Sequence, residues 1–346
     1  MFTERGDHVL VEEYTYPTFV ETGSPLGLKF TAVPMDEYGL RPDALDNMLQ
    51  SWNEDEAGKR PRIMYLVPTG QNPTGATASP ARRREVYRIA QRWNLYILED
   101  DPYYFIQFNH QGTENISSPH ELAKTLVPSY LSLDTDGRVF RMDTVSKVIA
   151  PGLRMGWVTA SEQVIERLVW AQETSVQNPS GLSQIIMFKL LQCWSQDNFA
   201  KWVLNLQSFY LSKRDTLKDV IDKFLPSEIV SYVLPQAGYY VSVGLVYFIK
   251  TTCILLTGRC QVWLSVDSSR HPDAGRKTTR QIEQEIYHEA LRQGALVIPG
   301  SWFQPHRELE REGVFFRISF APPSAAKMEE AIRRFGVTLR TCFSLD

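Results

Sequence analysis

Cysteine is scarce in this chain of 346 residues, and charge of one sign does not predominate. The four cysteines are far apart and form no Cys-x-x-Cys pair: Cys193, Cys253, Cys260 and Cys342. This argues against a disulfide framework and a zinc site, so we expect a reducing compartment and no bound metal. The 37 basic and 40 acidic residues give a net charge of -3, which offers no electrostatic reason to expect a nucleic-acid or membrane partner.

Long apolar runs are also missing. The longest tract, Val241 to Leu256, is interrupted by Lys250 and is shorter than the ~20 residues of a membrane span. The first residues, MFTERGDHVLVEEY, carry charges where a secretory signal needs an apolar core. We therefore expect a cytoplasmic protein, in which the glycosylation sequon at 115–117 is a chance match.

Several common catalytic motifs are absent. Gly70 and Gly75 have the spacing of a phosphate-binding loop, but Ala76 stands where that loop needs its lysine. The sequence contains no Gly-x-Gly-x-x-Gly, Gly-x-Ser-x-Gly or His-Glu-x-x-His either. Nucleotide, dinucleotide, serine-hydrolase and zinc-protease functions all lose support.

The composition that remains is that of an ordinary globular protein, with 43% hydrophobic and 22% charged residues. At about 150 residues per domain, the length predicts roughly two domains. The first half alternates short β-rich runs with amphipathic segments, which is typical of a parallel sheet covered by helices. The expected strands are Val9 to Glu12, Ile63 to Val67, Leu95 to Leu98, Arg138 to Met142 and Gly156 to Ala160, with a helix from Pro80 to Trp93.

The second half begins with helical segments from Ser161 to Trp194 and one long helix from Gln196 to Phe224. We place a domain boundary inside that helix, which gives a larger domain at 1–211 and a smaller α+β domain at 212–346. The smaller domain should contain strands at Gly238 to Val243, Val262 to Val266, Ala295 to Ile298 and Val314 to Phe320, and helices from Thr279 to Gln293 and from about Ser324.

Three polar clusters follow predicted strands, at the edge where open α/β sheets bind ligands. The first is PTGQNPTG at 68–75, a rigid turn that holds Asn72. The second is EDDPYY at 99–104, which places carboxylates and phenols where an apolar strand ends. Taken alone, the first is most simply a turn, and the charged residues of the second could serve only to cap the next helix.

The third cluster is SKVIAPGLRMGW at 146–157. Lys147 lies beside Ser146 and seven residues before Arg154, a set that can combine an amine nucleophile with a phosphate clamp. A lone lysine is normally a solvated surface residue. In the second half, Arg317 lies inside the apolar alternating strand FFRISF, where an arginine needs an anionic partner.

Together and in this order, the clusters resemble the fold-type I pyridoxal-phosphate aminotransferases of class I/II. The resemblance is closest to the aromatic amino acid, kynurenine and 2-aminoadipate aminotransferase group, particularly its fungal members. Ser-Lys-x-x-x-Pro-Gly-x-Arg-x-Gly is its most specific motif, and the likeness covers nearly the whole chain. It implies a three-layer large domain with a mostly parallel sheet, plus a smaller α+β C-terminal domain.

The resemblance also implies roles for the cofactor-binding residues. Lys147 would bond to the aldehyde of pyridoxal phosphate and later move a proton, which requires a neutral amine. Asp100 would hold the ring nitrogen in its protonated form. Tyr103 and Asn72 would bind the ring phenolate oxygen.

Four further positions receive roles in the same way. Ser146 and Arg154 would contact the phosphate, with the arginine acting as a bidentate clamp. Tyr16 would stack on the ring, although a packed turn tyrosine is the simpler interpretation of that residue. Arg317 would bind the substrate α-carboxylate, and Asn72 would also contact the substrate. The PGSWF loop at 299–303 would line the substrate pocket.

The implied reaction moves an amino group from an aromatic or 2-aminoadipate-like amino acid to a 2-oxo acid such as 2-oxoglutarate, in a homodimer when the chain is complete. An alternative is a truncated, inactive aminotransferase-like protein with weak or no cofactor binding. An aminotransferase-like module of a transcription regulator is disfavoured, because no basic DNA-binding segment precedes the motifs. The motifs are equally compatible with other reactions of this fold, such as β-elimination or cyclopropane formation.

The sequence departs from the family pattern at its start. Met1 aligns inside the large domain, and about a hundred or more residues that include a phosphate-cupping helix N-terminus have no counterpart. We therefore expect an N-terminally truncated domain with an unpaired sheet edge and exposed apolar surface.

A second departure is the 21-residue segment from Val241 to Gln261, which separates AGYY from VWLSVD. We hypothesise that it is a translated intron, because Val241-Ser242 can be encoded by the donor GTAAGT, Leu256-Thr257 can include the branch site CTAAC, and Gln261 can be the acceptor CAG. The alternative is a genuine surface hairpin, since long loops are tolerated. The nucleotide sequence of the gene tests this, and a donor other than GTRNGT would rule out the intron.

Overall fold

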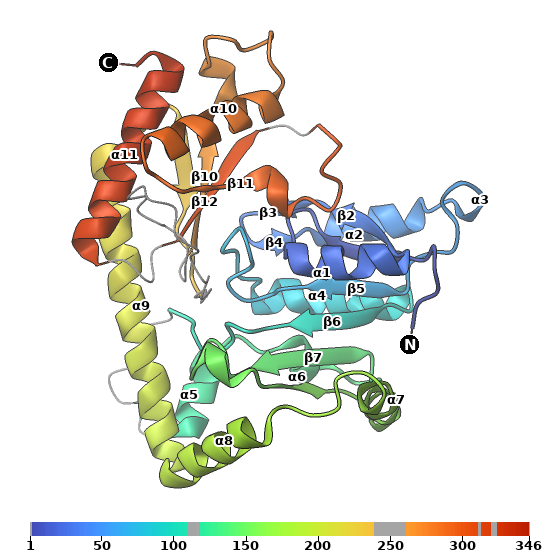
Figure 1. Ribbon diagram of the computed structural model, residues 1–346. Coiled ribbons are helices and arrows are strands. Elements are labelled where there is room, and N and C mark those ends of the chain that lie inside the picture. The colour runs from blue at the N-terminus through green and yellow to red at the C-terminus, as the bar shows by residue number, and fades with distance from the viewer. Residues whose placement is uncertain are drawn as a thin grey trace.

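The computed structural model describes residues 2–108, 116, 118–238, 261–310, 313–319 and 324–345. Its first half is built on a six-stranded sheet in the order β2-β1-β5-β6-β7-β8 (Figure 1). Neighbouring strands are parallel except for β7 and β8, which are antiparallel. The strands are β1 His8–Glu12, β2 Lys29–Val33, β5 Ile63–Leu66, β6 Tyr96–Asp100, β7 Val139–Thr144 and β8 Gly156–Thr159. This mixed α/β architecture with a mostly parallel sheet confirms the predicted fold class.

Alternation along the strands separates two cores on the two faces of the sheet. On one face, Leu10, Met64 and Ile97 pack against α2 (Pro42–Gln50), α4 (Pro80–Arg92) and α6 (Tyr130–Leu133). On the other face, Val9, Tyr65 and Val67 pack near α1 (Pro17–Gly23). Burial of both faces explains why β5 and the middle of β1 are continuously apolar.

The helices begin where the sequence supplies capping groups. The Ser79 hydroxyl accepts a hydrogen bond from the Arg82 amide at the start of α4, and Pro80 occupies its first turn. The remaining helices are α3 Glu54–Ala57, α5 Pro119–Thr125, α7 Glu162–Glu173, α8 Gly181–Cys193, α9 Gln196–Phe224, α10 Thr279–Arg292 and α11 Ala325–Phe343. Within the described residues, short 3₁₀ segments lie at Ser24–Leu26, Pro151–Leu153, Ser268–Arg270 and Gly300–Phe303.

The second half forms an antiparallel sheet in the order β11-β12-β10-β9. Its strands are β9 Val230–Val233, β10 Gln261–Val266, β11 Ile298–Pro299 and β12 Val314–Ser319. Leu264, Phe316 and Phe335 are fully buried in one core shared by this sheet, α9, α10 and α11. A two-stranded ribbon of β3 (Met35–Asp36) and β4 (Gly39–Leu40) belongs to the first half.

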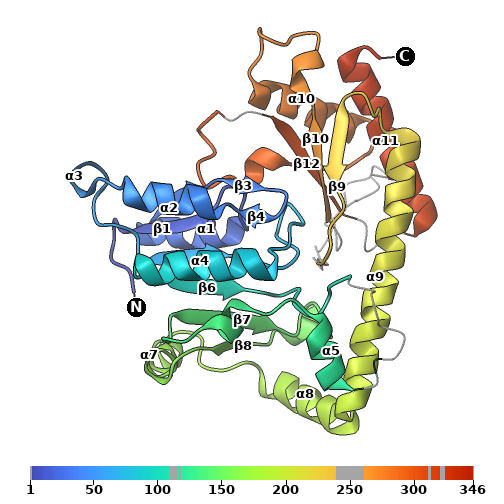
Figure 2. The same cartoon turned by 180° about the vertical axis from the view of Figure 1, so that it is seen from behind.

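Helix α9 joins the two halves and runs along one side of both (Figure 2). Near its start, Ala200 and Val203 pack with Leu122 and Val148 of the first half. Near its end, Leu217 and the residues around it enter the core of the second half. The expected boundary between residues 211 and 212 falls inside this continuous helix, and the exact division stays a prediction.

Two strands differ from the expectations, and two further expectations fall on residues that the structure does not describe. Strand β2 escaped the sequence analysis because its Lys29 and Thr31 break up an already short apolar pattern. The strand expected at Ala295 to Ile298 is reduced to the two residues of β11, although Ala295 and Val297 are buried. Most of the strand expected at Gly238 to Val243, and the insertion at 241–261 apart from the backbone of Gln261, lie outside the described residues.

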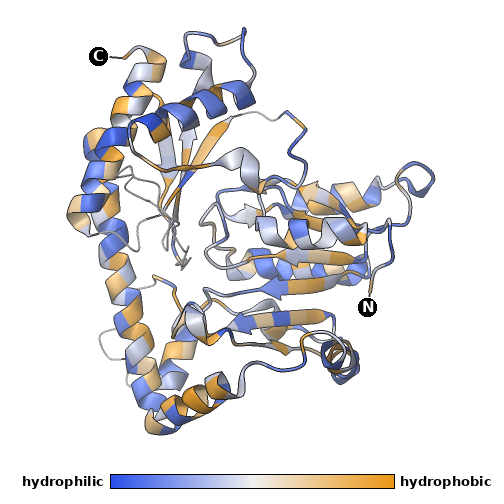
Figure 3. Cartoon of the chain, in the orientation of Figure 1, coloured by the Kyte–Doolittle hydropathy of each residue, from blue (hydrophilic) through white to orange (hydrophobic). Residues whose placement is uncertain are grey.

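The surface distribution of apolar residues is uneven. Figure 3 shows apolar colour along much of α8, and five of its side chains are 48–68% exposed: Leu182, Ile185, Ile186, Phe188 and Leu191. We call these five residues the α8 apolar surface. Among the described residues, no helix combines the length and apolarity that crossing a membrane requires.

Candidate functional site

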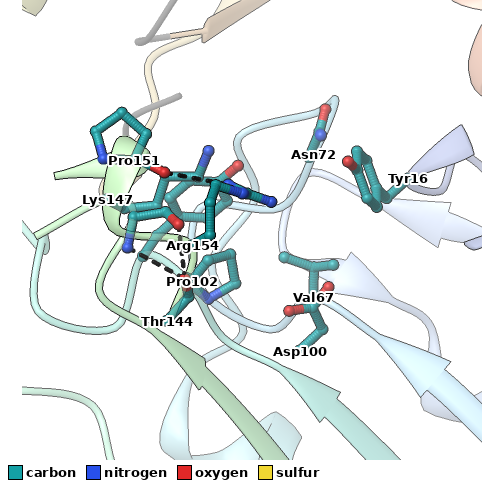
Figure 4. Close-up of a pocket in the computed structure, with 11 residues that line it drawn as sticks. Tyr16, Val67, Asn72, Asp100, Pro102, Thr144, Lys147, Pro151 and Arg154 are labelled. Atoms are coloured by element: carbon teal, nitrogen blue, oxygen red, sulfur yellow. Dashed lines mark hydrogen bonds between the residues drawn. The ribbon is translucent and has the colours of Figure 1, made fainter. Parts of the chain in front are cut away.

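A cavity of about 330 Å³ opens at the carboxyl ends of the parallel strands. Seven of the eight site residues predicted from the sequence line it: Tyr16, Asn72, Asp100, Tyr103, Ser146, Lys147 and Arg154. In Figure 4, Lys147 and Arg154 lie on one side of the cavity, and Asn72 and Tyr16 lie on the other. Three clusters far apart in the sequence therefore meet at one sheet edge, as expected.

The end of β6 directs its carboxylates to opposite faces. Asp100 lines the cavity, whereas Glu99 and Asp101 are buried away from it. Successive side chains of a strand alternate between the faces, so residues 99 and 101 share the face that Asp100 does not use. The strand period thus selects which aspartate of the EDD sequence reaches the ligand.

The buried carboxylates are held by two arginines. Arg141 donates from Nη1 to Glu99 and Asp101 at 3.4 Å each, and it binds Asp143 through two bonds of 2.8 and 2.9 Å. Arg83, which is 0% exposed, lies 3.9 Å from the same oxygens of Glu99 and Asp101. Removing one partner from such a cluster leaves a buried charge uncompensated, so the five residues stabilise each other as a set.

Asp100 carries an unusual charge environment. Burial raises the pKa of its carboxyl to about 6, and the neighbouring charges of Asp101 and Asp143 act in the same direction. The Tyr65 hydroxyl, which donates to Asp100 Oδ2 at 2.6 Å, and the charge of Lys147 oppose this shift. At neutral pH the side chain is still mostly a carboxylate and can bind a cation inside the cavity.

Hydrogen bonds from buried residues fix the loop that carries Asn72. The buried Glu12 carboxyl group at the end of β1 accepts from the Val67 amide at 3.0 Å and from Gln71 Nε2 at 3.1 Å. Gln71 Nε2 also donates to the Tyr14 carbonyl, and Gln71 Oε1 accepts from Thr74. These bonds fix the backbone on both sides of Asn72.

Gly70 lets this loop approach the second half of the chain. Its φ of +56° lies in the left-handed region, and a Cβ there would be 2.6 Å from the Ala237 carbonyl oxygen. Only glycine fits both constraints without displacing the backbone. The close packing of the two segments therefore depends on this position.

Arg317 does not line the cavity, but it reaches it through Asn72. Its Nη1 donates to Asn72 Oδ1 at 3.0 Å, so the amide nitrogen of Asn72 is the group that can donate to a ligand. The Arg317 guanidinium also lies over the Phe303 ring at 4.6 Å, and the Phe303 carbonyl accepts from the Thr15 amide at 2.8 Å. The loop at 299–303 thus supports the arginine from one side.

The segment after β7 presents the cationic groups. Thr144 Oγ1 donates to Ser146 Oγ at 2.9 Å, and the Ser146 amide donates to Thr144 Oγ1 at 3.1 Å. Lys147 follows, and the chain turns back so that Arg154, with a φ of +50°, returns to the cavity and donates to the Pro151 carbonyl. An amine, a guanidinium and two hydroxyls therefore come from one short segment.

The two tyrosines of the cavity have different settings. Tyr103 is buried just after β6 and belongs to the same core as Tyr65 and Val67. Tyr16 is partly buried at the N-terminus of α1 and lies beside Asn72 in Figure 4. This position at the cavity is compatible with both interpretations of Tyr16: a residue that stacks on the cofactor ring, and a turn residue that packs only against protein.

The set of groups suits one kind of ligand. A carboxylate fits a protonated ring nitrogen, an amine fits an aldehyde, and a guanidinium with hydroxyls fits a phosphate. A phenol and an amide remain to donate to a ring oxygen. Within the described residues, no group of three or more His, Cys, Asp or Glu side chains could hold a metal ion.

Sequence reasoning missed several residues of this site. Thr144 lines the cavity, Tyr65 binds Asp100, and Glu12 and Gln71 anchor the loop at 68–75. Tyr65 looks like an ordinary strand aromatic, and the partners of Glu12 are more than fifty residues away. The one sequence signal for Glu12 is that it is a polar residue at the end of an otherwise apolar run.

Comparisons with known proteins agree with this arrangement. A family model described as aminotransferase class I and II matches residues 1–335. An aromatic amino acid aminotransferase of Schizosaccharomyces pombe is 36% identical, over 99% of this chain and 69% of that protein. The mitochondrial kynurenine/alpha-aminoadipate aminotransferase of Bos taurus is 30% identical, over 98% of this chain and 70% of that protein. A crystal structure of a Candida albicans aminotransferase, 34% identical, matches 99% of this chain and 70% of its own with a TM-score of 0.86.

Glu12→Gln should change how stability depends on pH. Burial raises the pKa of Glu12 from 4.5 to about 8, so between these values the folded chain keeps a proton that the unfolded chain has released. Stability then falls as pH rises through this window, by up to about 1.4 kcal/mol per pH unit from this group. Glu12→Gln should remove that contribution, so its stability relative to wild type should increase from pH 5 to pH 8 in urea unfolding.

The exposed Glu56 offers a matched control for this measurement. Glu56→Gln makes the same chemical change at the surface, and its difference from wild type should stay constant over the same pH range. A pH-independent difference for Glu12→Gln as well would show that Glu12 does not titrate in the folded chain as described.

Proposed function

The chain belongs to the class I and II aminotransferase family, and we propose that it transfers the amino group of an aromatic or 2-aminoadipate-like amino acid to a 2-oxo acid, with 2-oxoglutarate as the expected acceptor. The observation that carries this proposal is the meeting of Lys147, Asp100 and Arg154 in one cavity. An amine nucleophile, a buried carboxylate and a guanidinium at one strand edge are the groups that transamination requires.

The substrate class rests on the relatives. The Schizosaccharomyces pombe protein is an aromatic amino acid aminotransferase, and the Bos taurus protein is named for kynurenine and alpha-aminoadipate. Two features of this chain suit such substrates: Arg317 can bind an α-carboxylate, and aromatic residues surround it. Phe303 lies under the guanidinium, and the Trp263 and Phe315 rings stack on each other at 5.3 Å beside it.

Pyridoxal phosphate is the cofactor of this family, and the residues of the cavity fit it. We assign Asp100 to its ring nitrogen, Tyr103 and Asn72 to its phenolate oxygen, and Tyr16 to its ring face. Ser146 and Arg154 are assigned to the phosphate, where Thr144 supports the Ser146 hydroxyl. Lys147 is assigned to the aldehyde.

The reaction then divides among these side chains. Bound pyridoxal phosphate supplies an electron sink for the electrons of the bond that breaks at the substrate α-carbon. The Asp100 carboxylate keeps a proton on the ring nitrogen, which maintains that sink. Arg317 would hold the substrate carboxylate, and the Lys147 amine would take the proton from the substrate α-carbon and deliver it to the carbon that the cofactor aldehyde provides.

Replacement of Lys147 tests the proposal directly. Wild-type chain mixed with pyridoxal phosphate should develop the visible absorption band of lysine-bound cofactor, and Lys147→Ala should not. Because the variant lacks both the nucleophile and the base, its conversion of a bound amino acid to the 2-oxo acid should fall at least about 100-fold.

Lys124→Ala provides the control, because Lys124 is an exposed residue of α5. It should keep both the band and the rate. A Lys147→Ala protein that turns over at the wild-type rate would refute the assignment. A wild-type chain that develops no band would instead favour the inactive aminotransferase-like alternative.

We also propose that two copies of the chain associate through the α8 apolar surface. Scattered apolar residues are normal on a protein surface, but five of the 13 residues of α8 are apolar side chains that are 48–68% exposed. The resemblance to homodimeric aminotransferases supports a second copy of the chain as the partner. The cytoplasmic location stays a prediction from the sequence.

A charge placed in this surface tests the association. Ile185→Asp should shift the molar mass measured by light scattering from that of a dimer towards that of a monomer, because the charge would have to be desolvated. Val233→Asp changes a similarly exposed residue on β9 and should leave the dimer intact. A monomeric wild type, or a dimeric Ile185→Asp variant, would contradict the proposal.

A further inference from the structure

We propose that Tyr65 is a positioning residue for the reaction: its hydroxyl holds Asp100 as a carboxylate of reduced basicity, so that the proton shared with the cofactor stays on the ring nitrogen. The inference rests on the proposed function, because it needs Asp100 to face that nitrogen. Tyr65 itself does not line the cavity and acts through Asp100 alone.

The geometry places the hydroxyl at one defined position. Tyr65 lies in β5, beside β6, and is paired with Leu98, two residues before Asp100. Its hydroxyl donates to Asp100 Oδ2 at 2.6 Å, which is the length of a charge-assisted bond. The Phe19 ring stacks on the Tyr65 ring at 3.8 Å with an angle of 8°, and Tyr65 is 1% exposed. The donor is therefore fixed by packing as well as by the bond.

The surrounding charges explain why Asp100 needs such a donor. Burial raises the pKa of Asp100, and the charges of Asp101, which follows β6, and of Asp143 on β7 act in the same direction. Lys147 is the cation that opposes them. In the proposed function Lys147 bonds to the cofactor, and the Tyr65 hydrogen bond then remains to stabilise the carboxylate.

Tyr65 is suited to donate at every working pH. Burial and the charge of Asp100 raise the pKa of its phenol well above 10, so the hydroxyl keeps its proton. A donor that never ionises stabilises the carboxylate without competing for the proton of the ring nitrogen. A stronger hydrogen bond to Asp100 makes the carboxylate a weaker base and moves that proton towards nitrogen.

The test uses 4′-deoxypyridoxine 5′-phosphate labelled with ¹⁵N in the ring, which has no aldehyde and cannot bond to Lys147. When it is bound to the wild-type chain at pH 7, its nitrogen should resonate near the position of a protonated pyridine. In Tyr65→Phe, the ratio of the form protonated on the ring nitrogen to the form protonated on Asp100 should fall on the order of tenfold. The ¹⁵N signal should therefore move towards the position of an unprotonated pyridine. A residue that only packed the core would not move this signal.

Two controls separate the hydrogen bond from general packing. Tyr87→Phe removes another phenol that donates to aspartates, at 2.5 Å to Asp136 and 3.0 Å to Asp134, far from the cavity, and should leave the signal unchanged. In an Asp100→Asn background, Tyr65→Phe should cause no further shift, because Tyr65 acts through that carboxylate.

A third variant guards against misfolding of Tyr65→Phe. Tyr65→3-fluorotyrosine keeps the ring and the hydroxyl but is a stronger donor, so it should move the signal in the opposite direction. The inference is overturned if the signal is unchanged in Tyr65→Phe, or if Tyr65→Phe and Tyr65→3-fluorotyrosine move it in the same direction. Neither outcome affects the role of Lys147 or the proposed function. A wild-type chain that binds the probe with an unprotonated nitrogen overturns the role of Asp100 and the inference with it.

Discussion

The site depends on the buried ion cluster of Arg83, Glu99, Asp101, Arg141 and Asp143. Two arginines and three carboxylates lie beneath the end of β6, and loss of one partner from such a set costs about 3–5 kcal/mol, because a charge is left buried and unpaired. Since Glu99 and Asp101 are fixed on one face, strand geometry commits Asp100 to the other. The direction of the carboxylate in the cavity is therefore enforced by charges that never touch a ligand. The anchors under the Asn72 loop act in the same way, with Glu12 and Gln71 holding a backbone that presents a neighbouring side chain.

Much of the site could be predicted from the sequence, because its ligand-facing groups lie in short motifs after apolar strands. Asn72, Asp100 and Lys147 each follow such a strand, and the parallel arrangement brings them together without further information. The supporting groups could not be found in this way. Tyr65 has the appearance of a core aromatic, Arg83 that of a surface residue on a basic helix, and Glu12 that of a strand end. Tyr65 pairs with Asp100, Arg83 with Glu99 and Asp101, and Glu12 with Gln71, across 16 to 59 residues of sequence that no local pattern encodes.

The fold shows the same division. The expected helices at Pro80, Gln196 and Thr279 begin within a residue of their predicted starts, because capping residues and proline mark helix N-termini chemically. Strand β2 was missed because Lys29 and Thr31 interrupt its apolar pattern, although Phe30 and Val33 are buried and the strand pairs with β1. The residues of β8 likewise do not indicate that this strand runs antiparallel to β7. Element identity is local, whereas the order and direction of strands are set by the whole sheet.

The continuity of α9 gives the molecule a mechanical property. A single helix of 29 residues, about 43 Å long, is part of both cores, so the two halves cannot turn about it independently without distorting its hydrogen bonds. Bending, which a long helix accommodates over many residues, is the softer motion. The Arg317–Asn72 bond is a further link between the two halves. Bending of α9 would therefore change the distance between Arg317 and the cavity that Asn72 lines.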